Sequence, residues 1–259
     1  MQTPVIINLE KGFLTATFYQ PENKPPPWQC VGFCHGFTGN RIEIRRLFVR
    51  FARRLNENGI AVFTFDYRGH GESSGDFDEF TMEDWRDDAK CALDYFLKRD
   101  DIIKDKISIL GFSMGGCIAS YLSVNPIVKR VLLWSPAAVP YHLFLLRLSQ
   151  FSEKDKNDFE TKKYVDFGGL KMTKRFVEVL KEIDPLKEIA KTKAEKIHII
   201  QSVDDSILDF NENALRYEKA LKDAKKSVTL LKIPNGGHIF SNLESEKMLF
   251  DSSLQFLNF

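Results

Sequence analysis

The sequence predicts an α/β fold in which a mostly parallel central sheet is covered by helices on both faces. Short apolar runs alternate with longer segments of helical periodicity along most of the chain. Most of the short runs are apolar throughout, as strands are when both of their faces are buried. The 259 residues are enough for one large core, so we expect a single domain over residues 1–259.

The elements follow from the chain in order. Runs rich in β-branched and aromatic residues at 5–9 and 13–19 flank Lys11-Gly12 and predict an antiparallel hairpin. Three prolines at 25–27 predict an extended loop. The alternation that follows predicts a strand at 30–34, a helix at 41–58, a strand at 60–66, a helix at 83–98 with Thr81 as N-cap, a strand at 107–111, a helix at 114–124 and a strand at 131–134.

After Ser135-Pro136 the alternation stops for about fifty residues, which is long for a connection in such a sheet. It resumes with a strand at 197–201, a helix at 213–224, a strand at 228–233 and a helix at 243–256. The interruption predicts an inserted cap over residues 137–185. Its first segment, 137–146, is apolar enough either to line a pocket or to pack on the core, and no charged pocket signature is visible in it.

Charge and composition limit the partners. The net charge is +1, from 37 basic and 36 acidic side chains, so no broad field favours nucleic acid or an anionic membrane, and we expect a small neutral molecule as partner. The N-terminus lacks a basic region followed by an apolar run, which predicts a cytoplasmic location, and no apolar stretch is long enough for a stable membrane anchor. Cys30 and Cys34 face the same side of one predicted strand and are not expected to form a disulfide. The oligomeric state stays open.

The clearest motif is Gly-Phe-Ser-Met-Gly-Gly at residues 111–116, which follows a predicted buried strand and begins a predicted helix. A nucleophilic serine has to stand clear of the sheet on a strained turn, and flanking glycines leave room for that turn. Ser113 is therefore the candidate nucleophile. The alternative is that these glycines only let the helix pack closely against the strand.

Two backbone amides are candidates for stabilising an oxyanion. Met114 N–H lies at the start of the predicted helix, where unpaired N–H groups favour negative charge. Phe37 N–H lies in His35-Gly36-Phe37-Thr38-Gly39, directly after an earlier predicted strand. The alternative for this second segment is a plain turn before a helix.

The candidate base is His238, chosen by its order along the chain. When the nucleophile lies on a strand–turn–helix elbow, the triad runs serine, acid, histidine. His35 and His70 precede Ser113, while His142 lies in the predicted insertion and His198 inside an apolar strand. His238 occupies a glycine-rich loop between the last predicted strand and the last predicted helix.

Two adjacent carboxylates, Asp204 and Asp205, follow the predicted strand at 197–201. Neighbouring side chains on a loop point in different directions, so one is expected to orient His238 while the other is solvated or caps a turn. The distance from the strand end favours Asp205, and Asp204 remains the alternative.

The polar cluster at 66–73 is expected to stabilise a glycine-rich turn, through charge-assisted hydrogen bonds of Asp66 and Arg68. The chain has no HExxH motif and its histidines are dispersed, so no metal site is expected. The chemistry of the candidate residues requires no cofactor.

Together these motifs resemble the α/β-hydrolase superfamily over nearly the whole chain. The segment His35-Gly36-Phe37-Thr38-Gly39-Asn40 is most similar to bacterial cinnamoyl and feruloyl esterases and to related monoacylglycerol-lipase-like carboxylesterases. The resemblance implies a capped esterase of small substrates. In that family the acid is the second carboxylate of a strand-end HGxxD pattern, which falls on Asp205. Gln201-Ser202 and Phe112 depart from the family pattern and are expected to alter packing around the triad.

The sequence thus predicts a serine carboxylesterase that cleaves short or medium acyl esters, or aryl esters of the cinnamoyl and feruloyl type, through an acyl-enzyme. A peptidase, a thioesterase or a carbon–carbon bond hydrolase with the same triad is an alternative. A ligand-binding protein that keeps this fold without turnover is a third possibility. Haloalkane chemistry is disfavoured because serine replaces the aspartate nucleophile.

Overall fold

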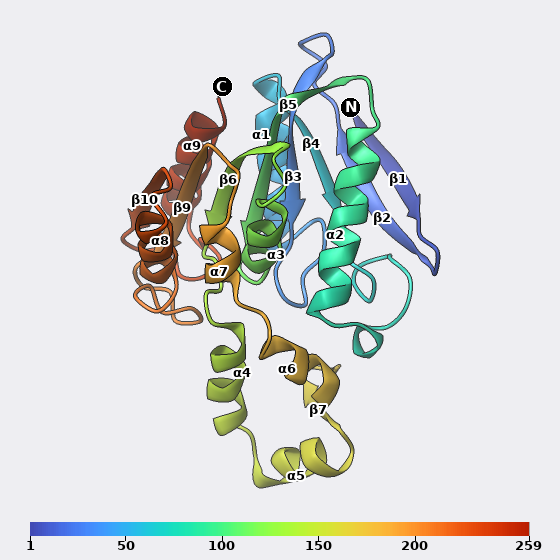
Figure 1. Cartoon of the computed structure of the whole chain (residues 1–259), viewed down its shortest axis with the longest axis vertical. Coiled ribbons are helices and arrows are strands. Elements are labelled where there is room, and N and C mark those ends of the chain that lie inside the picture. The colour runs from blue at the N-terminus through green and yellow to red at the C-terminus, as the bar shows by residue number, and fades with distance from the viewer. Residues whose placement is uncertain (259) are drawn as a thin grey trace.

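The computed structural model describes residues 1–258 and is built on an eight-stranded sheet in the order β1-β2-β4-β3-β5-β6-β9-β10 (Figure 1). Pairs β1–β2 and β2–β4 are antiparallel, and the pairs from β4 to β10 are parallel, which confirms the predicted class. The strands are β1 (Gln2–Asn8), β2 (Phe13–Tyr19), β3 (Trp28–Cys34), β4 (Ala61–Phe65), β5 (Ile102–Phe112), β6 (Val128–Trp134), β9 (Lys196–Ser202) and β10 (Val228–Ile233).

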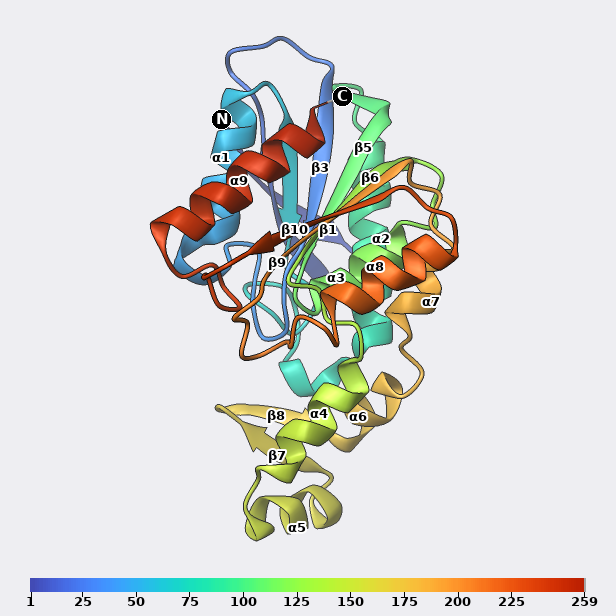
Figure 2. The ribbon, with the colours of Figure 1, turned by 90° about the vertical axis from the view of Figure 1, so that its left-hand side faces the viewer.

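Helices cover both faces of the sheet, as Figure 2 shows. One face carries α1 (Leu47–Glu57) and α9 (Leu243–Leu257), whose Phe51 and Leu249 are fully buried in one apolar cluster. The other face carries α2 (Met82–Leu97), α3 (Gly115–Leu122), α7 (Pro185–Ala190) and α8 (Ala214–Asp223), with Trp85 and Tyr217 in a second cluster. Burying each large apolar side chain stabilises the fold by about 1.5–3 kcal/mol.

Strand β3 divides its side chains between the two clusters. Cys30 and Cys34 lie in the α2 and α3 cluster, while Val31 and Phe33 lie in the α1 and α9 cluster. This follows from the alternation of side chains along a strand. Cys30 and Cys34 therefore share a face, as predicted, and all four cysteines of the chain are free.

The prediction of a helix from residue 41 is wrong at its start. A short 3₁₀ helix (Ile44–Arg46) precedes α1, and Glu43, Arg45 and Arg46 have positive φ. Tertiary hydrogen bonds explain the difference, because the Arg41 amide donates to Asp66 and the Glu43 carboxylate accepts from the Gly36 amide. These bonds outweigh the local helical propensity.

The last helix is tied to the middle of the sheet. The side-chain amide of Gln29 on β3 donates to the Leu257 carbonyl at 2.7 Å, across 228 positions of the chain. Arg130 on β6 donates to the Asn258 carbonyl at 2.6 Å. These bonds join the end of α9 to two central strands.

Most of the segment between β6 and β9 projects beyond the carboxyl ends of the parallel strands, whereas α7 at its end packs on the sheet (Figure 1). In the projecting part, Phe144, Phe159, Met172 and Phe176 are buried, and they belong to the same apolar cluster as Trp85 and Tyr217. We refer to residues 137–185 as the insertion. It contains α4 (Pro140–Ser149), α5 (Glu153–Thr161), β7 (Tyr164–Phe167), β8 (Leu170–Thr173) and α6 (Lys174–Leu180).

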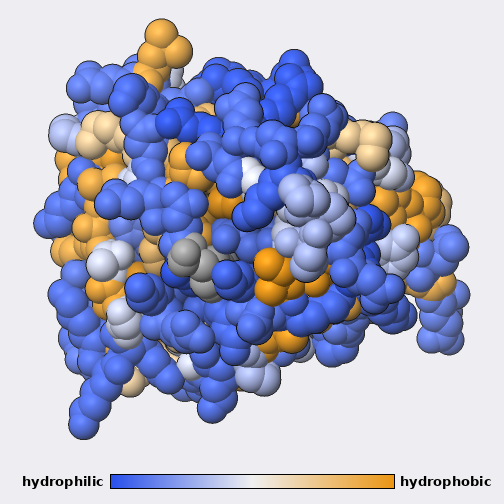
Figure 3. All heavy atoms as spheres, turned by 90° about the horizontal axis from the view of Figure 1, so that it is seen from above, coloured by the Kyte–Doolittle hydropathy of each residue, from blue (hydrophilic) through white to orange (hydrophobic). Residues whose placement is uncertain are grey.

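The end of the molecule opposite the insertion presents a mainly hydrophilic surface with separate apolar groups (Figure 3). Within residues 1–258, no helix has both the length and the apolar character needed to cross a bilayer.

Candidate active site

Ser113 stands at the turn between β5 and α3 with a φ of +53°. Its N–H donates to the Trp134 carbonyl at 2.9 Å. Its own carbonyl accepts from the amides of Gly116 at 2.9 Å and Ala137 at 3.0 Å. A left-handed conformation is costly for a residue with a side chain, and these bonds hold it in place.

The glycines on either side of Ser113 are required by close backbone contacts. A Cβ on Gly111 would lie 2.4 Å from the Gly115 carbonyl oxygen, and one on Gly115 would lie 2.1 Å from the Cys34 carbonyl oxygen. The glycines therefore do allow close packing of α3, and this same packing supports the turn that carries Ser113.

His238 joins Ser113 to Asp205. Its Nε2 lies 2.9 Å from Ser113 Oγ, and its Nδ1 lies 2.8 Å from Asp205 Oδ2. A carboxylate only accepts, so Nδ1 carries the proton and Nε2 is the free base that accepts from the serine hydroxyl. The structure brings together the three side chains that the sequence singled out.

The side chain of Asp205 is fully buried, and each of its two oxygens accepts two hydrogen bonds. Oδ1 accepts from the amides of Ile207 and Leu208, both at 2.9 Å, and Oδ2 accepts from Gln201 Nε2 at 3.2 Å in addition to His238. Gln201, which departs from the family pattern, is thus in direct contact with the acid. Sequence reasoning assigned it to packing alone.

Asp204 binds the backbone of the loop that precedes His238. Its Oδ1 accepts from the amides of Gly236 at 3.0 Å and Gly237 at 2.9 Å, and from the Ser202 hydroxyl. The Ser202 hydroxyl and then these two amides lower the pKa of Asp204. Asp204 therefore shapes the backbone that carries His238.

The predicted oxyanion donors, Phe37 and Met114, line the same cavity as Ser113. Among the described residues, neither backbone N–H donates a hydrogen bond. The carbonyl of the Gly36–Phe37 peptide accepts from His35 Nδ1 at 2.9 Å and from the Gly39 amide at 3.1 Å. Because a trans peptide is planar, anchoring this carbonyl also directs the Phe37 N–H on the opposite side.

His35 has a positioning role that chain order alone did not reveal. Burial lowers its pKa to about 4, while its bond to the Gly36 carbonyl acts in the opposite direction. Its Nδ1 carries the proton because a carbonyl only accepts, and Nε2 faces the Tyr67 amide at 3.4 Å. A neutral, fixed imidazole therefore supports residues 35–39, which carry the predicted oxyanion donor Phe37 and which we call the oxyanion loop.

Two further polar residues of the sequence analysis have structural partners. Asp66 accepts from the Arg41 amide at 2.5 Å and from the Glu72 amide at 3.2 Å, so it fixes the glycine-rich turn. Arg68 forms an ion pair with Asp88 of α2 at 2.8 Å. Both residues therefore hold the turn through charge-assisted hydrogen bonds, as predicted, and each does so with a partner outside it.

An apolar cavity of about 440 Å³ opens at Ser113 between the core and the insertion. Phe112 packs behind the site, with its ring 5.3 Å from the His238 ring. Arg147 and Gln150 of the insertion also line the cavity, which contradicts the expectation that no charge would line it. Other lining residues include Leu143, Phe144, Phe167, Met172, Phe176 and Leu180.

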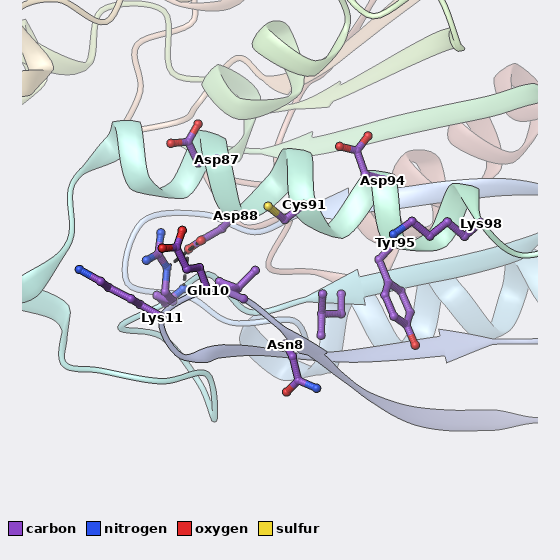
Figure 4. Close-up of a pocket in the computed structure, with 12 residues that line it drawn as sticks. Asn8, Glu10, Lys11, Asp87, Asp88, Cys91, Asp94, Tyr95 and Lys98 are labelled. Atoms are coloured by element: carbon purple, nitrogen blue, oxygen red, sulfur yellow. Dashed lines mark hydrogen bonds and ion pairs between the residues drawn. The ribbon is translucent and has the colours of Figure 1, made fainter.

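A second groove, of about 660 Å³, lies between the β1–β2 hairpin and α2 (Figure 4). Its lining includes Glu10, Lys11, Asp87, Asp88 and Asp94. None of the triad or oxyanion-loop residues contributes to it. Although this groove is larger, the apolar cavity is the one that contains the candidate chemistry.

Comparison with curated proteins gives matches of low identity. The chain is 30% identical over 127 residues to protein phosphatase methylesterase 1 of Candida albicans, which covers 48% of this chain and 33% of that protein. It is 28% identical over 219 residues to the uncharacterized protein R595 of Acanthamoeba polyphaga mimivirus, covering 84% and 69%. The match to the first relative thus spans about a third of its length.

Solved structures share the whole fold at low identity. Est1E from Butyrivibrio proteoclasticus with bound ferulic acid superposes with a TM-score of 0.81 at 24% identity, covering 98% of this chain and 99% of that one. Mouse alpha/beta hydrolase domain-containing protein 10 gives a TM-score of 0.73 at 18% identity, covering 99% and 100%. These similarities confirm the α/β-hydrolase fold. The family model described as serine aminopeptidase, S33, matches residues 25–198, more than half of the chain, and the protein therefore belongs to this family of α/β-hydrolases.

Proposed function

We propose that the protein is a serine carboxylesterase that hydrolyses short or medium acyl esters or aryl esters. The observation that carries the proposal is the hydrogen-bonded chain from Ser113 through His238 to Asp205 at the mouth of an apolar cavity. Phe37 and Met114 line the same cavity, and their amides, which donate no hydrogen bond within residues 1–258, supply donors for an oxyanion.

The reaction follows from this geometry in two steps. Ser113 Oγ attacks the ester carbonyl while His238 Nε2 takes its proton, and the Phe37 and Met114 amides donate to the carbonyl oxygen as it becomes negative. His238 returns the proton to the departing alcohol, which leaves an acyl-enzyme. Water activated by His238 then releases the acid, and Asp205 stabilises the imidazolium in both steps.

An aminopeptidase is the second candidate, because the matching family model has that description. A peptide with a free amino end carries an ammonium group, which requires an acceptor or a carboxylate when it is bound. In the described part of the chain, no aspartate or glutamate lines the cavity, and its charged lining residue is the cation Arg147. This charge favours neutral or anionic esters over peptides.

The test is a panel of p-nitrophenyl esters from acetyl to palmitoyl, methyl ferulate, and aminoacyl p-nitroanilides, with Ser113→Ala as the control. We expect turnover of short to medium esters, with Ser113→Ala reducing kcat by about 10⁴–10⁶-fold while the fold is retained. Preference for the anilides, with poor ester turnover, would contradict the proposal. Methyl ferulate turnover would place the protein among the aryl esterases, and failure on every ester would favour a different hydrolase or a binding protein.

A further inference from the structure

Glu43 is a carboxylate beside the oxyanion loop that neither the triad nor the sequence analysis uses. Its Oε1 accepts from the Gly36 amide at 2.7 Å. Its backbone has a φ of +59° and a ψ of 168°, a region that residues with side chains rarely adopt. Such a conformation costs of order 1–3 kcal/mol and persists where the surroundings enforce it.

The loop leaves space for this carboxylate through two glycines. A Cβ on Gly39 would lie 2.6 Å from Glu43 Oε1. A Cβ on Gly36 would lie 3.5 Å from the same oxygen and 3.3 Å from Ser113 Cβ. Glu43 therefore fills the hollow of the oxyanion loop, with Gly36 between its carboxylate and the nucleophile.

Glu43 lacks a compensating cation. In the part of the chain that the structure describes, no lysine or arginine forms an ion pair with it. Burial raises the pKa of Glu43 to about 6, against the opposing effects of the Gly36 and Ile44 amides and of His238. An unpaired carboxylate that is partly removed from water is costly to the fold, and such groups gather at functional sites.

We propose that Glu43 is a positioning residue of the oxyanion loop, which holds the Gly36 N–H and so fixes the backbone that presents the Phe37 N–H to the reacting carbonyl. The inference rests on the proposed function. Gly36 is then held at both of its backbone polar groups. Its N–H donates to Glu43, and its carbonyl accepts from His35 and Gly39. When the hydrogen bond to Glu43 is removed, the Phe37 amide is no longer held in one direction.

The experiment compares Glu43→Ala, Glu43→Gln and the parent protein on p-nitrophenyl butyrate. Removing a whole oxyanion donor costs about 10²–10³ in kcat, so we expect Glu43→Ala to lower kcat by about 10–100-fold, with KM changed by less than about threefold. Affinity for a phenylboronic acid, which mimics the tetrahedral intermediate, should fall in parallel. Glu43→Gln keeps an acceptor oxygen and should recover most of the lost kcat.

Glu246→Ala is the matched control, because it removes another mostly buried carboxylate, one that pairs with Arg50 on α1. We expect it to lower Tm and leave kcat close to that of the parent protein. The inference is overturned if Glu43→Ala keeps kcat within about twofold, or if Glu43→Gln is as slow as Glu43→Ala.

A separate measurement distinguishes this inference from the proposed function. If the parent protein hydrolyses no ester, the esterase proposal fails, but the rate at which a fluorophosphonate labels Ser113 still reports on the oxyanion loop. A labelling rate that falls at least about tenfold in Glu43→Ala and recovers in Glu43→Gln supports the positioning role. Equal labelling rates in all three proteins overturn it.

Discussion

Asp204 and Asp205 are adjacent in the chain and hold His238 from two sides. Asp205 binds the imidazole ring, whereas Asp204 binds the amides of Gly236 and Gly237 directly before the histidine. One carboxylate therefore sets the tautomer and the other sets the path of the loop. This division of roles leads to opposite expectations for their amide variants.

Asp205→Asn should reduce activity far more than Asp204→Asn. An asparagine at 205 no longer stabilises the imidazolium and permits the wrong tautomer, for which we expect a loss in kcat of about 10⁴-fold. An asparagine at 204 keeps an acceptor oxygen for the two glycine amides, so we expect a loss below about tenfold. Steady-state kinetics on one p-nitrophenyl ester measure both, and the reverse ranking would assign the acid to Asp204.

His70→Phe should make the stability of the fold less sensitive to mild acid. His70 packs among aromatic rings, 4.7 Å from that of Trp85, and burial lowers its pKa to about 3. As the pH falls below about 6.5, His70 becomes protonated in the unfolded chain but stays neutral in the folded protein. Protonation therefore stabilises the unfolded state, and the parent protein loses stability. When the pH is lowered from about 7.5 to 5.5, the free energy of unfolding of the variant should rise by about 1.4 kcal/mol relative to that of the parent protein.

Urea denaturation at the two pH values measures this shift. The opposing contributions of Glu43 and Asp88, whose pKa values burial raises, are common to both proteins and cancel. His142→Phe is the control, since this histidine is exposed on the insertion, and it should give no such pH-dependent gain. A stability difference for His70→Phe that is the same at both pH values would contradict the expectation.

Arg147→Gln should change the choice between anionic and neutral acyl chains. The guanidinium lies on the cavity wall 5.7 Å from the Phe167 ring centroid and contacts Gln150 Oε1 at 3.4 Å. Because Arg147 is exposed, its attraction for a carboxylate is of order 0.2–1 kcal/mol, or up to about fivefold in kcat/KM.

The measurement compares kcat/KM for methyl hydrogen suberate and methyl octanoate. Loss of the cation should lower the suberate to octanoate ratio by up to about fivefold. Arg175→Gln is the matched control, because Arg175 lies on α6 but does not line the cavity. An unchanged ratio in Arg147→Gln, or an equal change in Arg175→Gln, would show that Arg147 does not select the acyl chain.

The placement of Ser113, Asp205 and His238 follows from the order of strands and helices. In a parallel sheet the carboxyl ends of the strands meet at one edge, so residues directly after β5, β9 and β10 are brought together. The hydrophobic pattern determines those strands, and Gly111 and Gly115 are required because an added Cβ would collide with backbone oxygens. These features are local or topological, and the sequence is sufficient for them.

The supporting residues were not predictable in the same way. Glu43, His35 and Gln201 act through hydrogen bonds to Gly36 and Asp205, and their direction depends on loop conformations with no periodic signal. The start of α1 was misplaced for the same reason, because Arg41 is bound by Asp66, which lies 25 positions away. Whether Arg147 faces the cavity depends on the rotation of α4, which a nearly uniform apolar segment does not specify.

The hydrogen bond between Gln29 and Leu257 has a consequence for the order in which the site forms during folding. Ser113 and His238 lie 125 positions apart, and the helix that follows His238 is secured to β3 and β6 near its last residues. Contacts so distant in the chain are formed late and slowly, since a long loop has to close before they stabilise anything. On a ribosome, Ser113 would therefore emerge well before His238, and the hydrogen bond between them would form only after α9 docks and the supporting core is assembled.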